Sequence, residues 1–315
     1  MFLVISGFVA AFKEFDNVKQ VVKAVVLRFV RLYLLMMFAG VIIYMIYLTV
    51  GFHDDSLLKF FDSSFLSNRY NYQLVFVDIF IQPRFSLVCN SYKLSAPYWM
   101  IYSLFYGAVG IYIYKYLSKN VIKTAAGRAL CFAVITFAGW LVMDFLFLGV
   151  MLGLVLNILI TEKPVVSDTA NVVFNIMAAG SALALCGFHD AAYYFIMRFM
   201  PLPAFLAPNS NYKCIYAFFL LYALSKMPKV QKFFENKIFL SLFRLSFGIY
   251  SLHWPVMCSV GSLVILYMLG RYSFGVSLFA FGIAVAVSTL VLSVVYHFTG
   301  EKAAAILTDK LKKLL

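Results

Sequence analysis

The run RLSFGIYSLHWPV, residues 244–256, places a histidine, a tryptophan and a proline in succession within an otherwise apolar stretch. Burying an imidazole in lipid is unfavourable, so we expect His253 to face the interior of a helix bundle or a water-filled cavity. Histidine is also the usual general base near neutral pH. Pro255 removes a backbone hydrogen bond, which predicts a loosened helix at this point. The structural alternative is a hydrogen bond from His253 to another helix, beside a kink.

Two arginines, Arg28 and Arg31, stand at the beginning of another long apolar run. Guanidinium groups make bidentate contacts with phosphates, so this pair could hold a phosphorylated ligand. The alternative is that both residues act only as signals of membrane topology.

The remaining reactive side chains form no recognisable catalytic or metal site. The sequence contains no Ser-His-Asp arrangement and no zinc-ligand spacing, and His53, His189 and His297 are scattered, which favours non-catalytic roles. The pair Ser6–Gly7 is interpreted as a site of close helix packing and not as a nucleophile. The five cysteines contain no CxxC pair and are predicted to be free packing residues, with no disulfide framework: Cys89, Cys131, Cys186, Cys214 and Cys258.

The composition predicts a membrane protein. The chain has 315 residues, of which 64% are hydrophobic and 12% are charged, whereas a soluble domain carries roughly 25% charged residues. The formal net charge is +13, and the basic residues fall in clusters between apolar runs. Topology explains this pattern, and no nucleic-acid-binding motif with interleaved aromatics accompanies it, so nucleic acid is not an expected partner.

The apolar runs predict an all-α, polytopic transmembrane bundle with about nine spans. The run 129–160 is too long for one helix, and we divide it near Asp144, because a charge is tolerable at a helix end but costly at mid-bilayer. The predicted spans are 1–12, 29–50, 98–117, 129–143, 145–160, 171–187, 212–227, 246–269 and 275–298.

The charge clusters predict how these spans are oriented. Four basic clusters, within 13–31, 115–128, 226–244 and 302–313, are separated by two, four and two predicted spans, so all four can face the cytoplasm. This predicts a multi-pass protein of the cell membrane, with residues 51–97 as a long external segment. Residues 1–300 would form the transmembrane domain, and 301–315 a basic amphipathic cytoplasmic tail on the inner lipid surface.

Four motifs carry a resemblance to a known family. The stretch LSFGIYSLHWPV, 245–256, resembles the signature lSygiYLlHwPv of the membrane-bound acyltransferase 3 family. FLVISGFV, 2–9, is similar to the family's FFvlSGFli, and RFVRLY, 28–33, to its RllRiyPl. YHFTGEKAAAIL, 296–307, is similar to yyrlvEkPai and places Glu301 at the family's glutamate, where we expect it to pair with an arginine. The motifs agree in order and spacing over essentially the whole chain.

This resemblance implies transfer of an acyl group, acetyl in the simplest case, from a cytoplasmic acyl-CoA donor to a sugar or cell-surface glycan. Acetyl-CoA would be a donor substrate, with no permanently bound cofactor and no metal. His253 is the catalytic candidate, as an orienting or cavity group more than as the primary base. Arg28, Arg31 and Tyr250 are candidate donor contacts, and Trp99 is a candidate for stacking on the carbohydrate. Interface anchoring is the alternative for both Tyr250 and Trp99.

Two departures from the family pattern are visible. Members have about ten spans, and their first helix carries an arginine and an essential histidine. This chain begins at what resembles the second helix, which predicts an incomplete or inactive enzyme. Trp99 matches a family tryptophan, but Leu104 stands where an acid is frequent.

Two other interpretations of the sequence stay open. A transporter or flippase of lipid-linked glycans would also be a basic polytopic bundle, and a degenerate remnant would have no activity.

Overall fold

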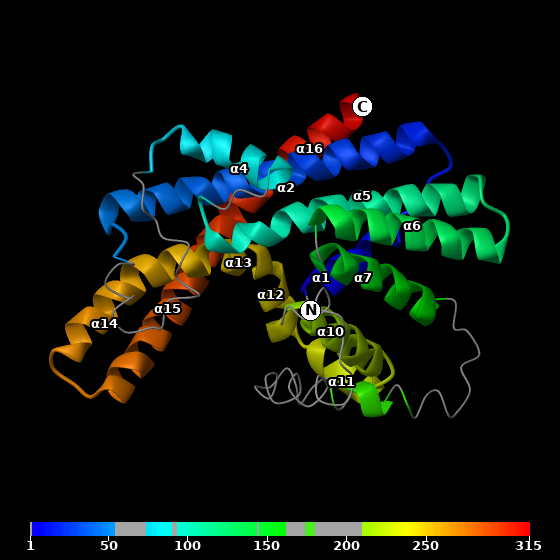
Figure 1. Ribbon diagram of the computed structural model, residues 1–315. Helices are drawn as coiled ribbons and strands as arrows, with labels where there is room; N and C mark the ends of the chain where they lie inside the picture. The colour runs from blue at the N-terminus through cyan, green and yellow to red at the C-terminus, as the bar shows by residue number, and fades with distance from the viewer. Residues whose placement is uncertain are drawn as a thin grey trace. The chain divides into compact units, whose positions relative to one another are not determined.

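The computed structural model describes residues 2–53, 74–89, 93–143, 145–161, 173, 175–178, 180 and 210–315. Every regular element within these ranges is a helix, which confirms the all-α class (Figure 1). Four described helical segments are long and apolar enough to cross a membrane: Val18–Thr49, Ala125–Met143, Ser246–Leu269 and Phe274–Leu314. The structure is thus that of an α-helical protein with several candidate membrane spans.

The chain divides into two compact units. Unit 1 comprises Met1–Val25 and Ser103–Asn236, and unit 2 comprises Val26–Tyr102 and Lys237–Leu315. Two helices, α2 (Val18–Thr49) and α5 (Trp99–Asn120), contribute residues to both.

Unit 1 is built around α7, on which α1, α6 and α10 pack (Figure 1). Besides its parts of α2 and α5, the described helices of unit 1 are α1 (Phe2–Ala10), α6 (Ala125–Met143), α7 (Phe145–Thr161), α10 (Ser210–Ser225) and α11 (Pro228–Phe234). The predicted division of the long apolar run is confirmed, because α6 ends at Met143 and α7 begins at Phe145. None of the residues of α6 is buried, which is typical of a helix whose surroundings are lipid.

The packing role predicted for Ser6–Gly7 is confirmed at the contact between α1 and α7. A Cβ atom on Gly7 would lie 1.9 Å from the carbonyl oxygen of Val150, and a Cβ atom on Gly153 would lie 2.2 Å from that of Val4. The two backbones therefore touch directly, which only residues without a side chain allow.

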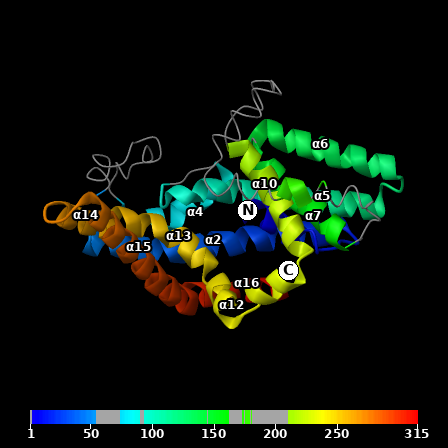
Figure 2. The same ribbon diagram turned by 90° about the horizontal axis from the view of Figure 1, so that it is seen from below.

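Unit 2 contains most of α2 and the C-terminal helices, among which α13 and α14 both pack on α15 (Figure 2). Its described elements after α2 are α4 (Asp78–Val88), η1 (Ala96–Tyr98), α12 (Lys237–Arg244), α13 (Ser246–Val256), η4 (Met257–Gly261), α14 (Ser262–Leu269), α15 (Phe274–Tyr296), η5 (His297–Glu301) and α16 (Lys302–Leu314). The tail beyond residue 301 is helical, as predicted.

The loosening predicted at Pro255 takes the form of a π-helix. The segment η4 follows α13 directly and has the wider turn of i→i+5 hydrogen bonding. Two of the carbonyls here have partners from outside the helical ladder: that of Pro255 accepts from the Ser259 hydroxyl at 2.7 Å, and that of Cys258 accepts from the His53 amide at 2.8 Å.

Part of the segment 51–97 forms a helix that is not predicted from the sequence. Residues 54–73 lie outside the described residues, but α4 packs against α2, where the Tyr33 hydroxyl donates to the Phe80 carbonyl at 3.1 Å. Asp78 and Gln82 are both buried and hydrogen-bonded to each other at 3.0 Å. The predicted span 171–187 also lies largely outside the described residues, as does His189.

Candidate functional site

His253 lies two turns into α13 and is half-buried. Its Nδ1 atom is 3.0 Å from the carbonyl oxygen of Ile249, one turn earlier in the same helix. A carbonyl can only accept, so Nδ1 donates this hydrogen bond, and in the neutral imidazole Nε2 then holds the lone pair. The hydrogen bond is therefore within the helix, and not to another helix as the structural alternative supposes. This tautomer leaves an acceptor atom available to a bound hydroxyl.

Two long-range hydrogen bonds hold the turn around His253 against the segment that leads into α5. The Tyr250 hydroxyl donates to the carbonyl of Pro97, and the Ser95 hydroxyl donates to the carbonyl of Ser251 at 3.1 Å. The rings of Tyr250 and His253 lie 6.5 Å apart. The fold therefore brings together residues that are about 150 positions apart in the sequence.

Trp99 begins α5 directly after this segment, and 37% of its surface is exposed. On the α13 side, Trp254 is buried and packs in an apolar cluster with Ala96 and Cys258. The two tryptophans thus differ in role: Trp254 closes the packing between the two segments, whereas Trp99 has a free face to offer to a ligand or to the lipid interface.

The two predicted phosphate-binding arginines lie on α2. Arg31 is exposed and Arg28 is half-buried, and their spacing of three residues makes them neighbours on the helix surface. One turn after Arg31, the carbonyl of Leu35 accepts a hydrogen bond from the Tyr296 hydroxyl at 2.9 Å. The arginines therefore precede the point at which α2 meets the end of α15.

A histidine–glutamate pair that is not predicted from the sequence occupies that end of α15. Nδ1 of His297 lies 2.6 Å from Oε2 of Glu301, within the π-helix η5. Their side chains are 27% and 18% exposed. Glu301 thus pairs with a histidine and not with the arginine that we expected. The H-x-x-x-E spacing was the available signal, because residues four apart are neighbours on a helix.

An ion pair joins the loop after α1 to the end of α5. Nζ of Lys119 lies 3.0 Å from the Glu14 carboxylate and 2.9 Å from that of Asp16, at an exposed position outside the apolar runs. Hydrogen bonding to Lys119, followed by its charge, lowers the pKa of both carboxyl groups below their ordinary values.

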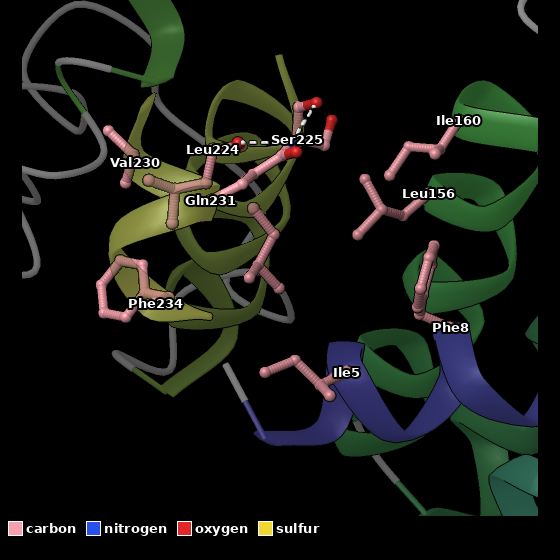
Figure 3. A pocket seen from close by; sticks show the side chains of 10 residues that line it. Ile5, Phe8, Leu156, Ile160, Leu224, Ser225, Val230, Gln231 and Phe234 are labelled. Atoms are coloured by element: carbon pink, nitrogen blue, oxygen red, sulfur yellow. Dashed lines mark hydrogen bonds between the residues drawn. The ribbon is translucent and has the colours of Figure 1, made fainter. Parts of the chain in front are cut away.

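A cavity of about 310 Å³ lies within unit 1, between α1, α7, α10 and α11 (Figure 3). Its lining is apolar apart from Ser225 and Gln231, and the Gln231 amide already donates to the Ser225 carbonyl at 2.7 Å. None of the predicted site residues lines this cavity. Its walls suit hydrocarbon and supply no group for acid–base chemistry.

No group of three His, Cys, Asp or Glu side chains that could hold a metal ion occurs in the described part of the chain. Four cysteines are free thiols, and the fifth, Cys186, is outside the described residues. Comparisons with protein-family models, with curated proteins and with solved structures found no match for this chain.

Proposed function

We propose that the chain is a membrane O-acyltransferase that moves an acyl group, in the simplest case acetyl, from cytoplasmic acyl-CoA to a hydroxyl group of a cell-surface carbohydrate. The observation that carries this proposal is the joining of the His253 turn to residues 95–97, beside Trp99. It puts a histidine with a lone pair on Nε2 and an aromatic side chain with an exposed face on two segments that are tied together.

The chemistry requires four events. The carbohydrate oxygen attacks the thioester carbonyl, the C–O bond forms, the C–S bond breaks, and the proton of the hydroxyl ends on the departing thiol. A positioned histidine accelerates the proton transfer, typically by 10²–10⁴-fold. His253 orients the hydroxyl through Nε2, and Trp99 stacks on the sugar ring. Arg28 and Arg31 hold the donor phosphates, while Tyr250 contacts the donor and fixes the wall formed by Pro97.

The proposed topology has nine spans in the cell membrane and a cytoplasmic C-terminus. Described helices at eight of the nine predicted segments support it, together with the placement of the basic clusters between them. Residues 1–300 are then the transmembrane domain, and α16 lies on the inner lipid surface with its lysines toward anionic headgroups.

Transfer of radiolabelled acetyl groups tests the function. Membranes that contain the chain are incubated with labelled acetyl-CoA and cell-surface polysaccharide, and label in the polysaccharide is counted. We expect His253→Gln to lower the rate by about 10²-fold. The matched control is His53→Gln, because that imidazole lies in the same unit and also contacts a main-chain carbonyl, that of Val50 at 3.1 Å.

The outcomes separate the competing functions. Absence of label with the unmodified chain would refute the acyltransferase proposal. Movement of lipid-linked glycan across the membrane without label would favour a transporter. Equal losses in His253→Gln and His53→Gln would show that the change at His253 acts through folding and not through the site.

A further inference from the structure

The pair His297–Glu301 has the geometry of an oriented base. An ionised carboxylate can only accept the 2.6 Å hydrogen bond, so Nδ1 of His297 donates it, and in the neutral imidazole Nε2 then holds the lone pair. No hydrogen bond to Nε2 occurs among the residues that the structure describes. A nucleophile's base that is itself oriented by a third group is the recurrent arrangement in acyl-transfer catalysts.

Surface pairing does not explain the position of these two side chains. An exposed ion pair contributes about 0–1 kcal/mol, but His297 and Glu301 are both largely covered and directly follow the 23-residue apolar helix α15. Ionisable side chains that the protein covers at the end of a transmembrane helix commonly mark functional pathways. The pair also lies in a π-helix, a distortion that is frequent at functional sites.

The residues next to the pair fix it against α2. The Tyr296 hydroxyl bonds to the Leu35 carbonyl at 2.9 Å, and a Cβ atom on Gly300 would lie 2.8 Å from Cβ of Phe38. The residue before η5 and one residue within it therefore hold this turn against α2. Leu35 is four residues beyond Arg31, or about 6 Å along α2.

We propose that His297 is the base that takes the proton of the acceptor hydroxyl, and that Glu301 is its positioning residue; this inference rests on the acyltransferase function proposed above. Nε2 of His297 removes the proton as the oxygen attacks the thioester carbon. The C–S bond then breaks, and the imidazolium returns the proton to the thiolate. The Glu301 carboxylate stabilises the transient imidazolium of His297. At His253 the corresponding partner of Nδ1 is a neutral main-chain carbonyl, which would stabilise an imidazolium more weakly.

Three variants test this assignment in the labelling assay, with kcat and KM for acetyl-CoA measured separately. We expect His297→Gln to lower kcat by about 10²-fold or more, with KM unchanged. Glu301→Gln should produce a smaller loss of kcat, because the amide keeps an acceptor oxygen but not the charge. The double variant His297→Glu with Glu301→His restores the pair in reversed order and moves the imidazole by one turn.

The reversed pair distinguishes a catalytic role from a structural one. If the pair only stabilises η5, the reversed chain should regain both the melting temperature and kcat of the unmodified chain, and this would overturn the proposal. If His297 is the base, the melting temperature should recover while kcat stays low. Should the reversed chain fail to fold, Glu301→Gln decides, because a lowered kcat at an unchanged melting temperature supports the proposal and an unchanged kcat overturns it.

The failure of this inference is distinct from the failure of the function on which it rests. Absence of label with the unmodified chain would overturn both. Label that survives His297→Gln but is lost in His253→Gln would overturn only the assignment of the base. His53→Gln again serves as the control that leaves activity intact.

Discussion

The contact between α1 and α7 gives the sharpest test of the packing. A Cβ atom at Gly7 would meet the Val150 carbonyl oxygen at 1.9 Å and Cα of Gly153 at 3.2 Å. Real Cβ atoms essentially never approach another heavy atom more closely than 3.0 Å. Gly7→Ala must therefore part the two backbones by about 1 Å, because neither neighbour is a flexible side chain that can turn away.

The free-energy change follows from this displacement. Overpacking typically costs about 1–3 kcal/mol, and a backbone contact puts Gly7→Ala at the upper end of that range. Gly282→Ala in α15 is the matched control, because no atom lies within 4 Å of its Cβ position. There the methyl group removes only glycine's helix penalty, and a gain of up to about 1 kcal/mol is expected. The variants should differ by about 3–4 kcal/mol, or roughly 6–16 °C in melting temperature.

Thermal unfolding in detergent, followed by circular dichroism, measures this difference. The rate of thiol labelling of Cys214 provides a second measurement. This side chain is 5% exposed, and its Sγ lies 2.7 Å from the Cβ position of Gly149 in α7. Parting α1 from α7 should speed the labelling of Cys214 in Gly7→Ala. Equal melting temperatures for Gly7→Ala and Gly282→Ala would refute the inference that the two backbones touch.

Two further outcomes are expected. Tyr296→Phe removes the side-chain hydrogen bond to the Leu35 carbonyl of α2 and should cost about 1 kcal/mol. This should appear as a lower melting temperature that Tyr272→Phe, at a residue 56% exposed, does not share. Lys119→Met should lower the melting temperature slightly at pH 7, and the difference from the unmodified chain should vanish on acidification. The pKa values of Glu14 and Asp16 are lowered in the folded chain, so their stabilising pairing is present above their ordinary values of 4.5 and 3.8 and is lost as the pH falls through the lowered ones. A difference that persists unchanged at pH 2 would contradict this pairing.

Features that depend on composition and on local backbone chemistry were predictable from the sequence. Long apolar runs predict helices, and the break between α6 and α7 was predictable because a lone carboxylate is costly inside an apolar helix. Pro255 predicts a disturbed ladder, and the π-helix η4 follows it. The small pair at Ser6–Gly7 predicts a close helix contact, which the backbones of α1 and α7 make.

Features that depend on tertiary contacts were not predictable in this way. The helix α4 contains Asp78, Pro83 and Arg84, which locally argue against an apolar helix, and contacts with α2 stabilise it. The hydrogen bonds of Tyr250 and Ser95 join segments about 150 residues apart, so no local pattern specifies them. The pairing of His297 with Glu301 is different. Its four-residue spacing is visible in the sequence, but only the structure shows that both side chains are largely covered.

The place where the η5 turn meets α2, at Leu35, gives a reason for the proposed use of both His253 and His297. Leu35 lies about 10 Å beyond Arg28 and about 21 Å before Thr49 at 1.5 Å per residue, against a hydrocarbon thickness of about 30 Å. In the proposed topology η5 is therefore nearer the cytoplasmic boundary. Under the proposed function the thioester arrives there while the donor phosphates stay at the arginines. Under the proposed function, a carbohydrate from the opposite side reaches η5 along α13, which touches α15 through Gly248. In the proposed topology His253 lies about 7.5 Å beyond Gly248 toward the outer side. Under the proposed function it orients the entering hydroxyl, and the base acts at η5, where the reactive end of the donor lies.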